Sequence, residues 1–125
     1  MAKILVIDDN PEILALHELM LEDCGHTVET VQESEESFEK IRAFQPDLLI
    51  LDILMPGVTG GTIYHAVRDT AGKNMPIIVS SASQMALKEN HDPMLKHCPK
   101  PVEYKELMAV IENMLHRAKA GSNSS

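Results

Sequence analysis

The amino-acid sequence predicts an α/β protein in which strands and helices alternate, with a parallel sheet between two layers of helices. Short apolar runs of four or five residues alternate along the chain with longer segments whose apolar residues recur at helical spacing. Two of these runs, residues 48–51 and 76–79, contain no charged residue, which is typical of strands that helices cover on both faces. Strict alternation of this kind implies right-handed crossovers and helices on both sides of the sheet.

Three strands and two helices are predicted in the first half of the chain. In order, they are a strand at 3–7, a helix at 11–24, a strand at 27–31, a helix from Ser34 to about Phe44, and a strand at 48–51. Pro11 is tolerated in the first turn of a helix, and Gly25 stands where a helix commonly stops. Ser34 is a good N-cap residue, and the two glutamates after it favour the first helical turn.

The second half continues the alternation after a loop rich in glycine and proline. It is predicted to contain a helix at 62–69, a strand at 76–79, a short helix at 84–90, a strand at 95–98 and a helix at 102–119. The last helix is amphipathic, with Leu107, Ile111 and Met114 among the apolar residues of one face. We therefore expect one domain over residues 1–119, followed by a disordered tail at 120–125.

Composition and charge exclude several classes of function. The formal charge of −8 argues against nucleic-acid binding, and the aromatic content of 3% offers no platform on which bases could stack. No apolar run approaches the roughly 20 residues that span a bilayer, so membrane insertion is not expected. The first apolar run is too short for a signal peptide, and Asp8 and Asp9 follow it where a cleavage site would stand. The sequence is therefore predicted to be cytoplasmic.

Charged and hydroxyl side chains follow four of the five predicted strands. In chain order they are Asp8 and Asp9, Asp52, Ser80 and Ser81, and Lys100. In an open parallel sheet, ligands bind beyond the carboxyl ends of the strands, so these groups are expected to converge on one edge. Three carboxylates held close together repel one another, and a hard divalent cation such as Mg²⁺ relieves that repulsion. The lysine and a hydroxyl could then hold the oxygens of a phosphoryl group.

One of these carboxylates could act as a nucleophile, because carboxylates form acyl phosphates in known enzymes. Asp52 is the natural choice, since it stands alone after a central strand, whereas Asp8 and Asp9 form a pair suited to a metal. An unpaired acid after a wholly apolar run is costly, so a purely structural role for Asp52 is hard to explain. Alternatively, Asp8 and Asp9 could cap the next helix, and Lys100 could be an ordinary surface lysine.

Four sequence motifs occur in a fixed order along the chain. They are Val6-Ile7-Asp8-Asp9, then Leu51-Asp52-Ile53-Leu54-Met55-Pro56-Gly57 followed by Gly60, then Pro76-Ile77-Ile78-Val79-Ser80-Ser81-Ala82, and finally Lys100-Pro101. Together they resemble the receiver domains of two-component response regulators, and the resemblance covers about residues 3–119. It implies a flavodoxin-like three-layer fold with a five-stranded parallel sheet in the order 2-1-3-4-5.

The resemblance also implies roles for the acidic residues. Asp52 would be the phosphoacceptor. Asp9, Asp52 and the backbone carbonyl of Leu54 would bind Mg²⁺, for which Mn²⁺ could substitute. Asp8 would orient a metal-bound water.

The remaining motif residues would act on the phosphoryl group. Ser81 would move to meet it, Lys100 would pair with one of its oxygens, and the Lys100–Pro101 peptide bond would be cis. The chain would then be a signalling domain rather than an enzyme. Its phosphodonor would be a sensor histidine kinase or a histidine phosphotransfer protein, and phosphorylation would switch the binding of an unknown downstream protein.

The chain departs from the family pattern in three places. The segment 81–100 is shorter than usual, so the fourth helix is expected to be short or irregular. His97 stands where the family has an aromatic switch residue, and a histidine can also titrate near neutral pH. Leu54 cannot hydrogen-bond an attacking water, so we expect a long-lived acyl phosphate.

The predicted helix at 11–24 is apolar on more than one face. Its apolar residues include Ile13, Leu14, Leu16, Leu19, Met20 and Leu21. Neighbouring elements could cover the extra face. Alternatively, Ile13 and Leu14 could belong to a surface that docks the helical phosphodonor domain of a histidine kinase, because receivers commonly dock beside this helix.

Three other functions compete with phosphorylation-dependent signalling. A Mg²⁺-dependent phosphohydrolase would place a second acid two residues after its nucleophile, where this chain has Leu54. A flavodoxin-like ligand binder would need a phosphate loop rich in glycine and hydroxyl groups after the first strand, where Asp8 and Asp9 would repel a phosphate. A receiver that folds but is never phosphorylated is the third, and the intact set of acids argues against it.

Overall fold

The structure is a computed structural model, and it describes residues 2–52, 57, 60–71, 75–81, 92–100 and 103–123. Its strands are β1 (Lys3–Ile7), β2 (Thr27–Val31), β3 (Leu48–Leu51), β4 (Ile77–Ser81) and β5 (Leu95–Pro99). Its helices are α1 (Pro11–Asp23), the 3₁₀ turn η1 (Ser34–Glu36), α2 (Ser37–Phe44), α3 (Gly60–Ala71) and α4 (Tyr104–Asn123). All strand pairs are parallel and the order is β2-β1-β3-β4-β5, which confirms the predicted topology.

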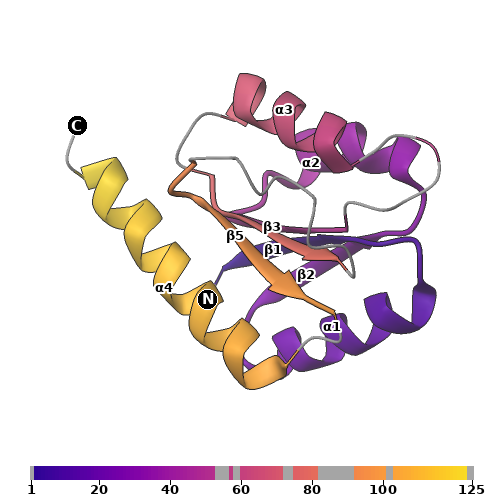
Figure 1. Cartoon of the computed structure of the whole chain (residues 1–125), viewed down its shortest axis with the longest axis horizontal. Helices are drawn as coiled ribbons and strands as arrows, with labels where there is room; N and C mark the ends of the chain where they lie inside the picture. The colour runs from indigo at the N-terminus through magenta and orange to yellow at the C-terminus, as the bar shows by residue number, and fades with distance from the viewer. Residues whose placement is uncertain are drawn as a thin grey trace.

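Helices cover both faces of the sheet, as Figure 1 shows, with α2 and α3 on one side and α1 and α4 on the other. The apolar residues of β1 and β3 point alternately to the two faces, so each strand contributes to both cores. One core includes Leu14 and Leu21 of α1 with Leu107 and Ile111 of α4. The other core includes Ile63 of α3. The predicted three-layer architecture is therefore confirmed.

Several element boundaries differ from the sequence-based expectation. Ser34 is not the N-cap of α2: it begins η1, which the Glu36 amide closes by donating to the Glu33 carbonyl at 2.9 Å, and α2 starts only at Ser37. The last helix continues to Asn123, so the tail expected from residue 120 is helical to that point, although Gly121, Ser122 and Asn123 have low helix propensity. The short helix predicted at 84–90 lies outside the described residues. None of the described helices has the length and apolar character needed to span a membrane.

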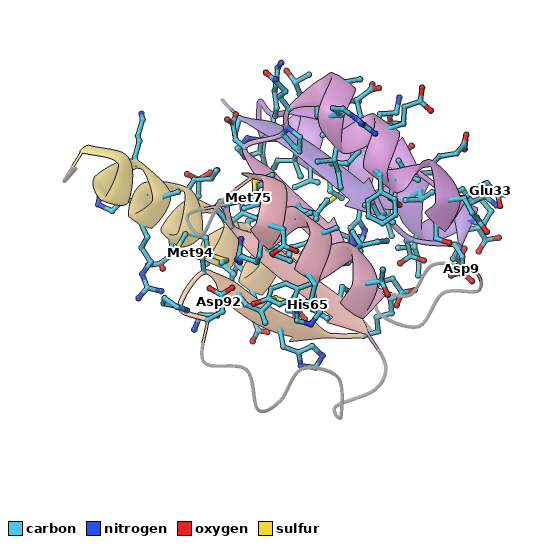
Figure 2. The ribbon with its side chains drawn as sticks, turned by 90° about the horizontal axis from the view of Figure 1, so that it is seen from above. Asp9, Glu33, His65, Met75, Asp92 and Met94 are labelled. Atoms are coloured by element: carbon cyan, nitrogen blue, oxygen red, sulfur yellow. The ribbon has the colours of Figure 1, made fainter. Side chains whose placement is uncertain are left out.

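A polar cluster at the amino end of the sheet ties α3 to β4 and β5. Arg68 of α3 pairs with Asp92, and the Tyr64 hydroxyl donates to the same carboxylate oxygen at 2.6 Å. The Arg68 guanidinium also donates to the backbone carbonyls of Met75 at 2.6 Å and Met94 at 3.2 Å. Figure 2 labels Asp92, Met75 and Met94 at this end, far from the Asp9 end of the sheet.

Replacing Arg68 with Met is expected to lower the free energy of unfolding by about 2–3 kcal/mol, because Asp92 loses a cationic partner in a mostly buried site. Burial by itself would raise the pKa of Asp92, but hydrogen bonds from Tyr64 and Arg68 outweigh it and hold that pKa below the ordinary 3.8. The stabilisation is therefore present above that ordinary value and is lost as the pH falls below it. Urea unfolding of both proteins at neutral and acidic pH should show the difference shrinking in acid. An equal difference at both pH values would contradict this account.

Candidate functional site

The acidic residues are positioned by the ends of two paired strands. Ile7 and Leu51 are register partners in β1 and β3, so Asp8 and Asp52 follow directly at the carboxyl edge of the sheet. The Asp52 amide donates to the Ile7 carbonyl at 2.9 Å, and the Asp8 amide donates to the Val31 carbonyl at 3.1 Å. Both acids therefore stand on a backbone that the hydrogen bonds of the sheet hold in place.

The carboxylates of Asp8, Asp9 and Asp52 converge as predicted, with one oxygen of each lying within 4.8 Å of the others. Asp8 is 3% exposed and Asp52 is 5% exposed, while Asp9 is open to solvent. Asn10, and neither of the two acids before it, caps α1: its side-chain oxygen accepts from the Glu12 amide at 2.9 Å. The capping alternative for Asp8 and Asp9 is therefore wrong.

Lys100 enters this cluster from the end of β5. Its Nζ lies 2.9 Å from Asp8 Oδ2 and 3.3 Å from Asp52 Oδ2, so one ammonium contacts the carboxylates of two strands. Burial by itself would lower the pKa of Lys100, but the hydrogen bond and charge of Asp8, with those of Asp52, raise it above its ordinary value. Lys100 is thus a cation at neutral pH and is not an ordinary surface lysine.

The donor set fits a hard divalent cation. Three carboxylates face one ammonium, which leaves two more negative than positive charges among the described residues of the site. All the acidic ligands are oxygen atoms, and Mg²⁺ prefers oxygen ligands and needs only a few carboxylates because it keeps several waters. Asp9 gives the cluster its solvent-facing side, where an incoming ion or a phosphate could enter.

The other predicted site residues are described only in part. Ser81 is the register partner of Pro99, so its backbone lies next to the residue before Lys100, and its side chain is outside the described atoms. Leu54 and Pro101 also lie outside the described residues, so the carbonyl ligand and the cis peptide bond stay predictions. His97 is exposed in β5 opposite Val79, and its role as a switch likewise stays a prediction.

One predicted docking residue is buried in the core. Leu14 is 6% exposed and packs in the core between the sheet and the helices α1 and α4, so its side chain is not available to a partner. The prediction for Leu14 is therefore wrong, because the sheet takes up this face of α1. The exposed large apolar residues of the helix are Leu16 at 47% and Leu19 at 64%. Ile13 is half-buried, and its docking role stays a prediction.

A buried polar pair beside the site was missed from the sequence. His17 of α1 is 2% exposed, and its Nδ1 lies 2.9 Å from the hydroxyl of Tyr104, the first residue of α4. Burial lowers the pKa of His17, although the charge of Asp8 acts in the opposite direction. A signal was present, since the helical period places His17 on the same face as Leu14 and Leu21.

Comparison with known sequences identifies relatives over nearly the whole chain. The family model described as "response regulator receiver domain" matches residues 4–112. The chain is 32% identical to the response regulator MprA of Mycobacterium ulcerans over 123 residues, covering 94% of this chain and 51% of that protein. It is 30% identical to the transcriptional regulatory protein AfsQ1 of Streptomyces coelicolor over 131 residues, covering 100% of this chain and 56% of that protein. The chain thus spans about half the length of the curated relatives it matches.

Solved structures give the same result. A receiver domain protein from Clostridium thermocellum superposes with a TM-score of 0.86 at 28% identity, covering 96% of this chain and 98% of that one. The chemotaxis protein CheY4 of Vibrio cholerae superposes with a TM-score of 0.82 at 27% identity, covering 91% and 98% of the two chains. The flavodoxin-like fold expected from the sequence is therefore confirmed.

Proposed function

This chain belongs to the response-regulator receiver family of two-component systems, and from that premise we propose that it accepts a phosphoryl group on Asp52 in a Mg²⁺-dependent reaction. The observation that carries the proposal is the position of Lys100, whose ammonium contacts Asp8 and Asp52 beside the carboxylate of Asp9. That arrangement combines a nucleophile, a group of metal ligands and a cation for a phosphoryl oxygen.

Asp52 is better suited to the attack than its two neighbours. Asp8 accepts a hydrogen bond from the Asn10 amide at 3.0 Å on one oxygen and contacts Lys100 at 2.9 Å on the other. Asp9 is exposed, and water would solvate its carboxylate and weaken it as a nucleophile. Asp52 is 5% exposed and directly follows the central strand β3, and its amide is hydrogen-bonded to the Ile7 carbonyl, so its carboxylate is both shielded from water and held in place.

In the proposed reaction, a carboxylate oxygen of Asp52 attacks the phosphorus of a phosphohistidine in line with the leaving nitrogen. The O–P bond forms as the P–N bond breaks, and the leaving imidazole takes its proton from solvent. Lys100 pairs with a phosphoryl oxygen and keeps its proton throughout. Mg²⁺, held by Asp9 and Asp52 with Asp8 oriented toward its waters, would supply further neutralisation of the phosphoryl charge.

The proposed reaction also implies two kinds of partner for this chain, a phosphodonor and a recipient of the signal. The phosphodonor is a sensor histidine kinase or a histidine phosphotransfer protein, and the receiver of the signal is a downstream protein or a further segment of a longer chain. Relatives such as AfsQ1 carry names of transcriptional regulators and are about twice as long as this chain. Phosphorylation would favour one of two pre-existing conformations of the domain and thereby change partner binding.

Incubation of the wild-type protein with acetyl phosphate tests this function directly. Intact-protein mass spectrometry should show one phosphoryl adduct with Mg²⁺ and none with EDTA, and neutral hydroxylamine should remove the adduct because acyl phosphates react with it. Phosphoramidate, whose P–N bond resembles that of phosphohistidine, is a second donor. No adduct from either donor in Mg²⁺ would instead support a receiver that is never phosphorylated.

A further inference from the structure

A contact between the buried His17 and the partly buried Tyr104 joins the helices α1 and α4. The Tyr104 hydroxyl lies 2.9 Å from His17 Nδ1, and the two rings meet edge to face with centroids 5.5 Å apart. Tyr104 packs against the apolar core between the sheet and the helices α1 and α4, and His17 is buried on α1 together with Leu14 and Leu21 of that core. Figure 1 shows the first turn of α4 beside α1.

The same two segments also meet at the site itself. Lys100 contacts Asp8, and four residues after Lys100 the chain reaches Tyr104, which contacts His17 nine residues after Asp8. The Lys100–Asp8 pair and the Tyr104–His17 pair are thus two contacts between the same two stretches of the sequence, one near the start of α1 and one near the start of α4. A lysine side chain is long and flexible, so its ion pair alone fixes the backbone poorly. The Tyr104–His17 contact can restrict the position of the backbone near Lys100 where the lysine ion pair does not.

A polar pair suits this task better than an apolar one. Apolar contact is non-directional and allows helices to shift, whereas a hydrogen bond in an apolar layer has one good geometry. Moving α4 away from α1 would separate the partly buried Tyr104 hydroxyl from His17 and leave the buried imidazole with its backbone hydrogen bond to Ile13 but without its partner in α4, which is costly. The pair therefore resists displacement of α4 relative to α1.

The electrostatics of the site agree with a positioning role. Burial lowers the pKa of His17, and the charge of Lys100 lowers it further, so the imidazole is neutral at neutral pH although Asp8 opposes the shift. A neutral ring does not compete with Lys100 for the carboxylates of Asp8 and Asp52.

We propose that Tyr104 and His17 are positioning residues, and that their hydrogen bond holds the start of α4 against α1 so that Lys100 is aimed at Asp52. The proposal rests on the proposed function, because Lys100 is assigned there to the phosphoryl group. It adds two residues that touch neither the phosphoryl group nor the acidic cluster in the described contacts.

Tyr104→Phe tests the proposal because it removes the hydroxyl and keeps the ring. We expect its maximal rate of phosphorylation by acetyl phosphate to fall roughly five-fold, because the loss of one hydrogen bond leaves Lys100 less well positioned toward Asp52. The acetyl phosphate concentration that gives half the maximal rate should change little. Tyr64→Phe is the matched control, since it removes the only other tyrosine hydroxyl, which binds Asp92 at the opposite end of the sheet. That control should lose stability but keep the wild-type rate.

Variants of His17 make the same test from the other side of the bond. His17→Leu should slow phosphorylation as much as Tyr104→Phe, and the double variant should be no slower than either single one. His17→Asn should retain most of the rate, because the amide of asparagine can stand where Nδ1 stands in histidine. Equal rates for His17→Leu and His17→Asn would overturn the proposal, and this pair decides the question even if Tyr104→Phe fails to fold.

A readout that does not need phosphorylation separates this inference from the proposed function. The side-chain methylene resonances of Lys100, assigned by their loss in Lys100→Met, should move toward those of a free lysine in Tyr104→Phe and stay in place in Tyr64→Phe. Unchanged Lys100 resonances in Tyr104→Phe would overturn the positioning role. If the wild-type protein takes no phosphoryl group, the proposed function fails, and these resonances still decide whether the pair positions Lys100.

Discussion

Asp52→Asn is expected to abolish the Mg²⁺-dependent phosphoryl adduct completely. The amide nitrogen and oxygen of asparagine are far weaker nucleophiles than a carboxylate, and the substitution also removes one of the three carboxylate charges at the site. The protein should remain folded, because the side chain keeps its shape and one of three mutually repelling charges is lost. Intact mass after incubation with acetyl phosphate and Mg²⁺ measures the result, with circular dichroism to verify the fold.

Asp47→Asn is the matched control for this substitution. Asp47 and Asp52 flank the same strand, β3, at opposite ends, and the Asp47 carboxylate accepts a hydrogen bond from the Lys3 amide far from the site. Asp47→Asn should keep the full adduct. An adduct that survives Asp52→Asn would place the nucleophile elsewhere, and fragmentation of the phosphorylated protein would then identify the modified acid.

Lys100→Met is expected to slow phosphorylation on the order of 100-fold, the usual effect of removing one preorganised charge from a developing anion. Methionine keeps much of the length of lysine but cannot pair with a phosphoryl oxygen. Binding of Mg²⁺ should persist or become tighter, because the ammonium no longer competes for the oxygens of Asp8 and Asp52. Initial rates with acetyl phosphate and calorimetric titration with Mg²⁺ measure the two effects separately.

The stability of Lys100→Met should depend on the metal. Without Mg²⁺, its carboxylates lose their cationic partner and the melting temperature should fall below that of the wild type, whereas added Mg²⁺ should restore most of the difference. Lys96→Met is the control, since Lys96 is an exposed lysine of β5, the strand that Lys100 directly follows. A Lys100→Met protein that reacts at the wild-type rate would remove Lys100 from the mechanism. A variant that no longer binds Mg²⁺ would mean that Lys100 shapes the metal site itself.

The sequence alone was sufficient to predict the fold and the acidic cluster. Apolar runs of strand length in strict alternation with helical segments allow few topologies, and the carboxyl ends of parallel strands share one edge of the sheet. The residues that follow those runs, Asp8, Asp9 and Asp52, are therefore placed together by the sequence pattern alone. Asp52 could be singled out because a charged residue directly after a fully apolar strand is costly unless a partner or a function compensates for its burial.

Some details of local structure were beyond the sequence pattern. The turn η1 precedes α2, closed by the hydrogen bond from the Glu36 amide to the Glu33 carbonyl, and such 3₁₀ turns are frequent at the N-termini of α-helices. In α1 the apolar residues occupy more than one face, so periodicity could not tell Leu14, which is in the core, from the exposed Leu16 and Leu19. Only packing against the sheet decides which face is covered.

The specific side-chain contacts between distant residues were decided by the tertiary structure. His17 and Tyr104 are 87 positions apart, and Lys100 and Asp8 are 92 positions apart. Spacing within one helix or strand indicates which residues share a face, but it carries no information about which side chain of another element lies opposite. Sequence thus determined the layers, the sheet edge, and the acids and the lysine on it. Packing of α1 and α4 on the sheet decided that His17 meets Tyr104, because this contact depends on the relative placement of segments that the chain brings together only when it folds.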